Sequence, residues 1–307
     1  MNSTLIIQFV IVFSIVFKTS CVDSLKPSWE YEVDNPLDKE IVIEIDEKEW
    51  SIPAYTSLKV KVNQGKHVLT YNGNSVHFVT KANSNKSVTI INPTLSNYML
   101  QAIFYARENA QNDDISALYL ENSHEYQTDE GVVMLPVKVL NTLFIEQSHT
   151  NWQFGLGEDT KSEMSTSYPG KKYVFHKLYR ESEYKKEYAE ELPQGVIFPV
   201  NSRKLSEQPA YVFPTESLMS DCDAANQFVK DLESRWNNII ADPSDMLQDV
   251  AKLRYDAVSE LDRNSKLNKA CGAVFNSGRD DKEFREMLSR MSDEMTYLSN
   301  GTSFIVK

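Results

Sequence analysis

The sequence lacks the short motifs by which several classes of enzyme are recognised. It contains no Gly-x-Ser-x-Gly nucleophile elbow, no His-Glu-x-x-His zinc helix and no phosphate loop that ends in Gly-Lys-Ser or Gly-Lys-Thr. Its five histidines include no pair four residues apart. His67 and His77 flank an Asn72-Gly73 turn at equal distance, so we expect them to be cross-strand neighbours if that hairpin is tight. We assign no catalytic, cofactor-binding or metal-ligating residue from the sequence.

An excess of positive charge is also missing. Lys and Arg number 32 against 44 Asp and Glu, which gives a formal net charge of −12 at pH 7. Binding to nucleic acid requires a basic surface that meets the phosphates, and anionic lipids attract the same kind of surface. We therefore expect no nucleic-acid partner.

Long apolar runs are scarce, and the one that stands out extends from Leu5 to Phe17. It is too short for a membrane-spanning helix, which needs about 20 apolar residues. The small residues that follow in Lys18-Thr-Ser-Cys21 suit a secretory signal, although no Lys or Arg precedes the run. We predict that residues 1–24 are a signal peptide and that the protein is secreted, periplasmic or bound to the cell envelope, without a transmembrane span.

The end of this signal can be processed in three ways. Cleavage after Cys21 or after Ser24 is favoured, because small residues stand one and three positions before each cut, and both cuts discard Cys21. Lipidation of Cys21 is the alternative, since Thr19-Ser20-Cys21 resembles the end of a bacterial lipobox, although Lys18 stands where that motif has Leu. An uncleaved anchor is the third. The mature protein is released in the first case, held by a lipid tether in the second and held by its own N-terminal segment in the third.

The composition predicts a folded α+β protein with more than one domain. Hydrophobic residues make up 41% of the chain and charged residues 25%, which is ordinary for a globular protein. The length beyond the signal exceeds that of a usual single domain. We expect an antiparallel β-sandwich over 25–92, a mixed α+β region over 93–215 that either continues the first sheet or forms its own, and a helical module over 216–307.

Residues 39–91 show the alternation of half-buried strands. Ile41, Ile43 and Ile45 point to one side of their strand, and turn-forming residues such as Asn72-Gly73 separate this segment from the next apolar ones. Helices would require a period of about 3.6 residues, which is absent here. The expected strands are 41–45, 58–62, 68–71, 76–80 and 88–91.

Part of this region resembles a known module. It has a strand, a tight turn, a second strand marked by proline, and a glycine followed by an apolar strand. The residues concerned are Asn35-Pro36, Ile43 to Asp46, Ile52-Pro53, Leu58 to Val62 and Gly65 to Leu69. This order resembles the PEGA-type β-sandwich modules of bacterial cell-envelope proteins. The resemblance implies attachment or binding at a surface rather than catalysis, and it assigns no functional residue.

The middle region has a weaker pattern. We expect a helix over 181–191, and Pro136 is expected to confine its strand to a sheet edge or a bulge. Glu158-Asp159 follows a glycine-marked turn and is expected to form an acidic, solvated edge. The expected strands are 97–106, 132–143, 173–175 and 196–198.

The C-terminal part changes to helical spacing. Apolar residues predict three helices, over about 225–240, 247–261 and 284–298, and Asp242-Pro243 supplies the stop between the first two. The first two should lie antiparallel. Such a hairpin brings Cys222 and Cys271 within the roughly 4.4–6.8 Å between Cα atoms that a disulfide requires. Closing this loop would stabilise the fold by roughly 4 kcal/mol in the chain-entropy model.

Two functions remain open at this point. The first is an exported, non-enzymatic protein that acts through contacts with a protein or a glycan, which accords with the signal, the module resemblance and the missing motifs. The alternative is a secreted hydrolase of glycans or esters whose site is assembled from distant residues around Trp152 to Asp159. An acid pair for glycoside hydrolysis needs no local sequence motif.

Overall fold

The computed structural model describes most of the chain after the predicted signal. The signal peptide predicted over 1–24 and the lipidation predicted at Cys21 lie outside the described residues and stay predictions. The described residues are 27–81, 87–106, 112–163, 172–211, 220–243, 246–260, 265–275 and 279–307.

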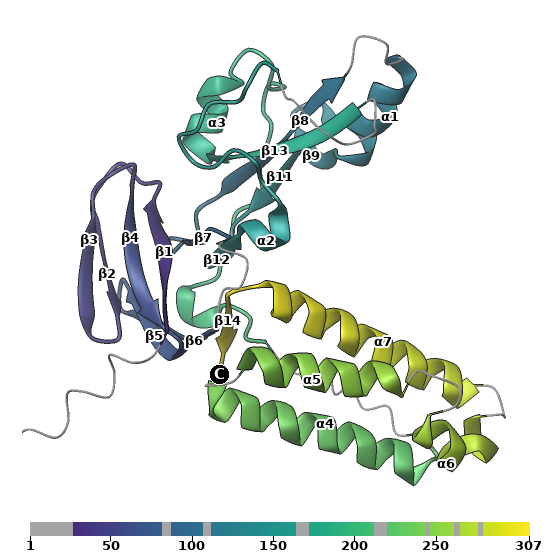
Figure 1. Cartoon of the computed structure of the whole chain (residues 1–307). Helices are drawn as coiled ribbons and strands as arrows, with labels where there is room; N and C mark the ends of the chain where they lie inside the picture. The colour runs from purple at the N-terminus through teal and green to yellow at the C-terminus, as the bar shows by residue number, and fades with distance from the viewer. Residues whose placement is uncertain are drawn as a thin grey trace, which may run out of the picture.

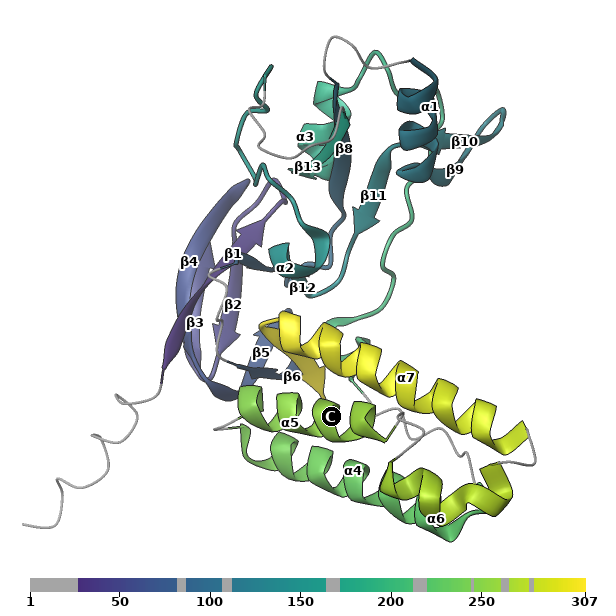
Figure 2. The same cartoon turned by 45° about the vertical axis from the view of Figure 1, so that its right-hand side comes forward.

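The predicted α+β class is confirmed. The described strands form four sheets, and helices α4 to α7 follow one another in the C-terminal part. A β-sandwich lies at the left in Figure 1, a lobe built from the middle of the chain lies above it, and the C-terminal helices lie below (Figures 1 and 2). We call these parts the sandwich, the middle lobe and the helical module.

The sandwich packs a four-stranded sheet against a five-stranded sheet. The first has the order β12 (Phe144–Glu146), β7 (Thr89–Ile91), β1 (Ser28–Asn35) and β4 (Thr56–Asn63). The second has the order β14 (Ser303–Val306), β6 (Asn74–Thr80), β5 (Gly65–Tyr71), β2 (Ile41–Ile45) and β3 (Lys48–Ile52). Alternate residues from both sheets form one buried core, which includes Ile43, Val60 and Leu69.

The sandwich differs from the predicted one in its boundaries. It is not confined to 25–92, because β12 comes from the middle of the chain and β14 from residues 303–306. It is also not purely antiparallel, since β1 pairs in parallel with β7. Both incoming strands lie at sheet edges, where they pair with backbone groups that would otherwise remain open.

The middle lobe is built around β8 (Tyr98–Ala106), which lies between β11 (Val137–Leu140) and β13 (Lys172–Arg180). A separate hairpin, β9 (His124–Thr128) and β10 (Gly131–Leu135), packs beside it. The described residues of this part also form three α-helices, namely α1 (Asn112–Glu121), α2 (Gln147–Thr150) and α3 (Glu181–Glu187), and a 3-10 helix, η2 (Leu205–Glu207).

Two strand predictions in this lobe are wrong. The strand expected over 132–143 is two strands, because Pro136 has no N–H to donate and separates β10 from β11, while its carbonyl accepts the amide of Ala102 at 2.8 Å. The segment 196–198 forms only an isolated bridge between Ile197 and Gln127 rather than a strand. The helix expected over 181–191 ends earlier, at Glu187.

The helical module contains four helices in its described residues instead of the three predicted. They are α4 (Asp223–Ala241), α5 (Met246–Ser259), α6 (Lys266–Phe275) and α7 (Arg279–Asn300). Helices α4 and α5 run antiparallel (Figures 1 and 2). Cys271 lies inside the unpredicted helix α6, and its Cα atom is 5.7 Å from that of Cys222, with the two sulfur atoms bonded. The predicted juxtaposition of the two cysteines is therefore present.

The helical module packs on the outer face of the five-stranded sheet. Neighbouring residues of β6 point to opposite faces, so Phe78 enters the sandwich core while Val79 joins the core of the helices together with Phe304 of β14. Among the described residues, none of the helices combines the length and the apolar character needed to cross a membrane.

Candidate functional site

The histidines expected to face each other lie on opposite faces of their hairpin. The Asn72-Gly73 turn pairs His67 with Phe78 and leaves His77 opposite Val68. A two-residue turn places the centre of the hairpin between Asn72 and Gly73, and a one-residue offset reverses the face of a strand. The predicted facing pair is therefore absent.

His67 is buried and takes part in a set of linked polar groups that begins at the exposed Asp46. Its Nδ1 lies 2.5 Å from the Asp46 carboxylate, and its Nε2 lies 2.7 Å from the Asn63 carbonyl and 3.2 Å from the Thr80 hydroxyl. Although an acid, an imidazole and a hydroxyl in sequence resemble a catalytic triad, the Thr80 hydroxyl is fully buried and donates to the Asn63 carbonyl at 2.6 Å. These hydrogen bonds link the ends of neighbouring strands.

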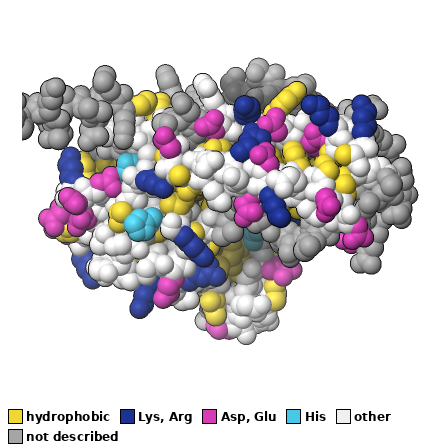
Figure 3. Space-filling view, turned by 90° about the horizontal axis from the view of Figure 1, so that it is seen from below, with side chains coloured by type: hydrophobic (Ala, Val, Ile, Leu, Met, Phe, Trp, Pro, Cys, Tyr) yellow, Lys and Arg dark blue, Asp and Glu magenta, His cyan; other side chains and the backbone are white. Residues whose placement is uncertain are grey.

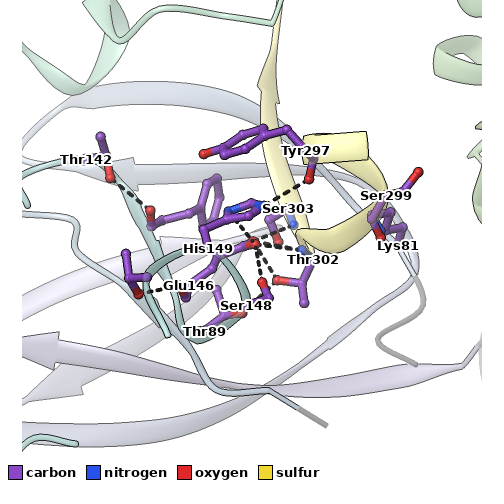
Figure 4. A network of polar contacts seen from close by, with 12 residues as sticks. Lys81, Thr89, Thr142, Glu146, Ser148, His149, Tyr297, Ser299, Thr302 and Ser303 are labelled. Atoms are coloured by element: carbon purple, nitrogen blue, oxygen red, sulfur yellow. Dashed lines mark hydrogen bonds and ion pairs between the residues drawn. The ribbon is translucent and has the colours of Figure 1, made fainter. Parts of the chain in front are cut away.

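A second buried cluster joins the three parts of the molecule around Glu146, at the end of β12 (Figure 4). The carboxylate of Glu146 is 2% exposed. It accepts the amide of Thr302 at 2.8 and 3.0 Å, the hydroxyl of Thr302 at 2.8 Å and the amide of Ser303 at 2.9 Å. A strand of the sandwich is thereby tied to the segment that links α7 to β14. We call this the Glu146 cluster.

His149 and Gly301 complete the Glu146 cluster on the side of α7. The His149 ring stacks on Tyr297 with centroids 3.8 Å apart, its Nδ1 lies 3.2 Å from the Glu146 carboxylate, and its Nε2 lies 2.9 Å from the Tyr297 carbonyl (Figure 4). Both ring nitrogens thus face acceptors. A Cβ atom on Gly301 would lie 2.6 Å from a Glu146 oxygen, so the close approach requires glycine.

Lys81 supplies a buried cation near Glu146. It is 2% exposed, and its ammonium group donates to the carbonyl of Ser299 in the last turn of α7 at 2.6 Å. This position suits a cation, because the C-terminal carbonyls of a helix carry partial negative charge. Burial lowers the pKa of Lys81 to about 8, and the Glu146 carboxylate opposes that change.

We expect Lys81 to titrate near pH 8, far below the ordinary lysine value of 10.5. In this case the unfolded chain binds a proton between about pH 8 and 10.5 that the folded protein has released. The contribution of Lys81 to the free energy of unfolding therefore rises with pH over that range. Carbon–proton correlation spectra of the lysine Cε groups measure the midpoint directly. The signal of Lys81 is the one that is missing from the spectrum of the Lys81→Met variant. The exposed Lys59 serves as control, because its pKa is raised rather than lowered. A midpoint above pH 10 for Lys81 would contradict the expectation.

A third buried cluster joins the sandwich to the middle lobe. Asp34 of β1 is fully buried, and the Arg180 guanidinium binds it through two hydrogen bonds, from Nε at 2.9 Å and from Nη2 at 2.5 Å. The hydroxyls of Ser57 and Tyr98 donate to the same carboxylate, each at 2.6 Å. Burial and the Asp34 charge raise the pKa of Tyr98, which keeps its hydroxyl a donor. All of these groups have partners within the chain, so the cluster has a structural role and holds the middle lobe against the sandwich.

Replacement of Arg180 by Met is expected to lower the free energy of unfolding by about 3 kcal/mol, because it leaves a buried carboxylate without its cation. Ser57 and Tyr98 still donate to Asp34, which limits the loss. Urea denaturation of the two proteins measures the difference. The control is Lys185→Met, which breaks a more exposed ion pair with Glu181 in α3 and should change stability by no more than about 1 kcal/mol. Equal losses in the two variants would contradict this account.

An aromatic cavity of about 230 Å³ lies between α1 and α3 of the middle lobe. Phe104 and Tyr119 form one wall, with ring centroids 5.8 Å apart, and Tyr184 and Tyr188 form another, with centroids 4.7 Å apart. Gln101 contributes a polar side chain that is already bonded, since it accepts the Tyr184 hydroxyl at 3.0 Å and donates to the Ala102 carbonyl at 2.9 Å. The remaining lining residues are Ala102, Leu135, Pro136, Glu191 and Leu192. We call this the aromatic pocket.

A wider cavity of about 710 Å³ lies on the other side of α3 and is lined by charged residues. Glu158 and Asp159, which the sequence placed at an acidic edge, are both in its wall, together with Glu183 and Glu187. Lys177 is 6% exposed there, and its ammonium group donates to the Glu158 carbonyl. Burial lowers the pKa of Lys177. We call this the acidic cavity.

No sequence pattern indicated the aromatic pocket. Tyr184 lies on α3 and Tyr188 directly after it, four residues further on, but Tyr119 comes from α1, a helix whose apolar residues show no clear helical period. Trp152, expected near a hydrolase site, is instead 4% exposed and belongs to the core of the lobe. Only the packing of distant elements brings the rings together.

Comparisons of the chain with protein families, with curated proteins and with solved structures found no match. The resemblance of residues 35–92 to PEGA-type modules therefore stays a prediction. Within the described ranges, no three side chains of His, Cys, Asp or Glu are grouped so that they could hold a metal ion.

Proposed function

We propose that this protein is an exported, non-enzymatic binding protein whose middle lobe carries the ligand site. The observation that supports this most is the aromatic pocket, because four of its ten lining residues carry aromatic rings and the side chain of Gln101 in its wall is already bonded within the chain. Pockets of this kind favour binding by burial of apolar surface. The Asp34 cluster fixes the lobe on the sandwich. The Glu146 cluster ties β12 to the segment between α7 and β14, and both clusters are closed by partners in the chain.

Export is supported by the cysteines. Cys222 and Cys271 lie at disulfide distance, and disulfides persist in oxidising compartments outside the cytosol. This agrees with the signal peptide predicted over residues 1–24. On the face shown in Figure 3, basic side chains alternate with acidic ones, which agrees with a partner other than nucleic acid.

The intact mass of the protein isolated from its own cells tests the export part of the proposal. A chain that begins at Val22 or Leu25 is a cleaved and released protein, whereas a diacylglycerol adduct on Cys21 is a tethered one, and either result supports export. A deficit of two hydrogens supports the bond between Cys222 and Cys271. A full-length chain with free thiols would overturn this part of the proposal.

A secreted hydrolase is the second candidate, and the acidic cavity is the observation in its favour. Carboxylates of Glu158, Asp159, Glu183 and Glu187 line one open cavity, and glycoside hydrolysis needs a pair of them. Turnover of glycan or ester substrates that is lost in Glu158→Gln or Asp159→Asn would support the hydrolase and overturn the binding proposal. The matched control is Glu49→Gln, an exposed carboxylate on β3. An inactive wild type over a broad panel would leave the hydrolase without support.

A further inference from the structure

We propose that the aromatic pocket binds the trimethylammonium group of a choline-type ligand. This inference rests on the proposed binding function of the middle lobe and names the chemistry of its ligand. The cavity of about 230 Å³ lies below the roughly 300–1,000 Å³ of pockets for drug-sized ligands, so it suits a small head group.

The arrangement of the rings favours a cation. Ring faces carry partial negative charge, and an organic cation within about 6 Å of a ring centroid is attracted to them. The pocket has two ring pairs in its lining, one from β8 and α1 and one from α3 and the residue that follows it, so that a group in the pocket meets aromatic surface from both pairs. Such aromatic enclosures are a known means of binding quaternary ammonium groups.

The charge in the described lining of the pocket has the matching sign. Glu191 is the charged residue in its described lining. Burial raises the pKa of Tyr184 and of Tyr188, and the negative charge of Glu191 contributes to both increases. The hydroxyls are therefore neutral at pH 7, and Glu191 supplies the negative charge of the lining. A ligand with an anionic group would meet repulsion from Glu191.

Rings of the same aromatic cluster already hold cations from the chain itself. The ammonium group of Lys177 lies 4.5 Å from the centroid of the Tyr179 ring, and that of Lys185 lies 5.7 Å from the centroid of Phe198. Tyr179 and Phe198 both pack edge-on against Tyr184. The aromatic pocket offers rings of the same kind to a cation from outside.

The polar groups of the pocket favour a methylated ammonium over a primary one. A primary ammonium group brings three N–H donors that need acceptors when they leave water. Gln101 already uses both ends of its side-chain amide within the chain, so Glu191 would be left to supply most of the acceptors. A trimethylammonium group has no N–H and needs only apolar contact and negative potential.

Calorimetric titration of the full chain with choline chloride tests the proposal. The comparison ligand is the neutral analogue in which carbon replaces the nitrogen. We expect choline to bind at least about tenfold more tightly than the analogue, since the charge supplies the cation–π attraction. Equal affinities, or no binding of choline in any form, would overturn the proposal.

Variants of the pocket locate the site. Tyr188→Ala should weaken choline binding at least about tenfold, whereas Tyr188→Phe, which keeps the ring, should stay within about threefold of the wild type. Glu191→Gln changes an exposed residue and should weaken binding about threefold, because it removes the negative charge of the lining. The matched control is Tyr255→Ala, a tyrosine of α5 that is 73% exposed. Unchanged affinity in both Tyr188→Ala and Glu191→Gln would overturn the assignment to this pocket.

Vesicles distinguish the source of the ligand. Phosphatidylcholine vesicles present the same head group as free choline, and phosphatidylglycerol vesicles are the control. Binding of free choline alone identifies a small-molecule ligand, and binding of phosphatidylcholine vesicles identifies a lipid head group; both support the proposal. If the protein binds neither free choline nor phosphatidylcholine vesicles, this inference fails. The proposed binding function still stands in that case, provided that the protein is exported and is inactive on hydrolase substrates. Turnover of those substrates would instead overturn the binding function, whatever the result with choline.

Discussion

Replacement of Glu146 by Gln is expected to lower the free energy of unfolding by about 5 kcal/mol, more than the loss expected for Arg180→Met. The buried carboxylate accepts hydrogen bonds from Thr302 and Ser303, and a glutamine would turn an NH₂ group toward some of these donors. It would also leave the buried ammonium of Lys81 without the carboxylate that supports its charge. Chemical denaturation measures the loss.

The matched control for this prediction is Glu49→Gln on β3. Glu49 is exposed, so the same chemical change there should alter stability by less than about 0.5 kcal/mol. Partial rescue is expected from the double variant Glu146→Gln with Lys81→Met, because the second change removes the uncompensated charge. A loss below about 1 kcal/mol in Glu146→Gln would show that the Glu146 cluster does not fasten the three parts together.

Removal of the bond between Cys222 and Cys271 is expected to destabilise the protein by about 4 kcal/mol. The two residues are 49 positions apart, and opening a loop of that length gives the unfolded chain about this much additional entropic freedom in the chain-entropy model. The double variant Cys222→Ala with Cys271→Ala tests this by thermal and urea denaturation. The helical module should be the part most affected, because both residues lie in its core.

Reduction supplies the control for the disulfide. A thiol reductant should lower the stability of the wild type toward that of the double variant and leave the double variant unchanged. An oxidised wild type that is no more stable than the double variant would contradict the expectation.

Local periodicity was sufficient to predict many of the elements. Strand β2 and helix α7 were predictable because one face of each is buried, so that apolar residues recur every second or every three to four residues. Strand β1 was missed although Tyr31 and Val33 point to the core, since an acidic residue follows each of them and reduces the apolar signal. Helix α1 was missed for lack of any clear period.

The sequence could not reveal which distant segments meet. Residues 144–146 and 303–306 are short, and only their pairing with β7 and β6 makes them strands. Glu146 is one of many carboxylates in the chain, and its role depends on Thr302, which lies 156 positions away. The aromatic pocket is likewise assembled from α1, α3 and β8. No local pattern encodes these contacts.

The position of β14 has a consequence for the time course of synthesis. This strand covers the edge of β6, yet more than 220 residues separate the two along the chain. At a synthesis rate of about 5–20 residues per second, roughly 10–45 s pass between the emergence of the two strands. An unpaired sheet edge is a template for association with other chains. A nascent chain of this protein therefore carries such an edge for tens of seconds before its own last strand covers it.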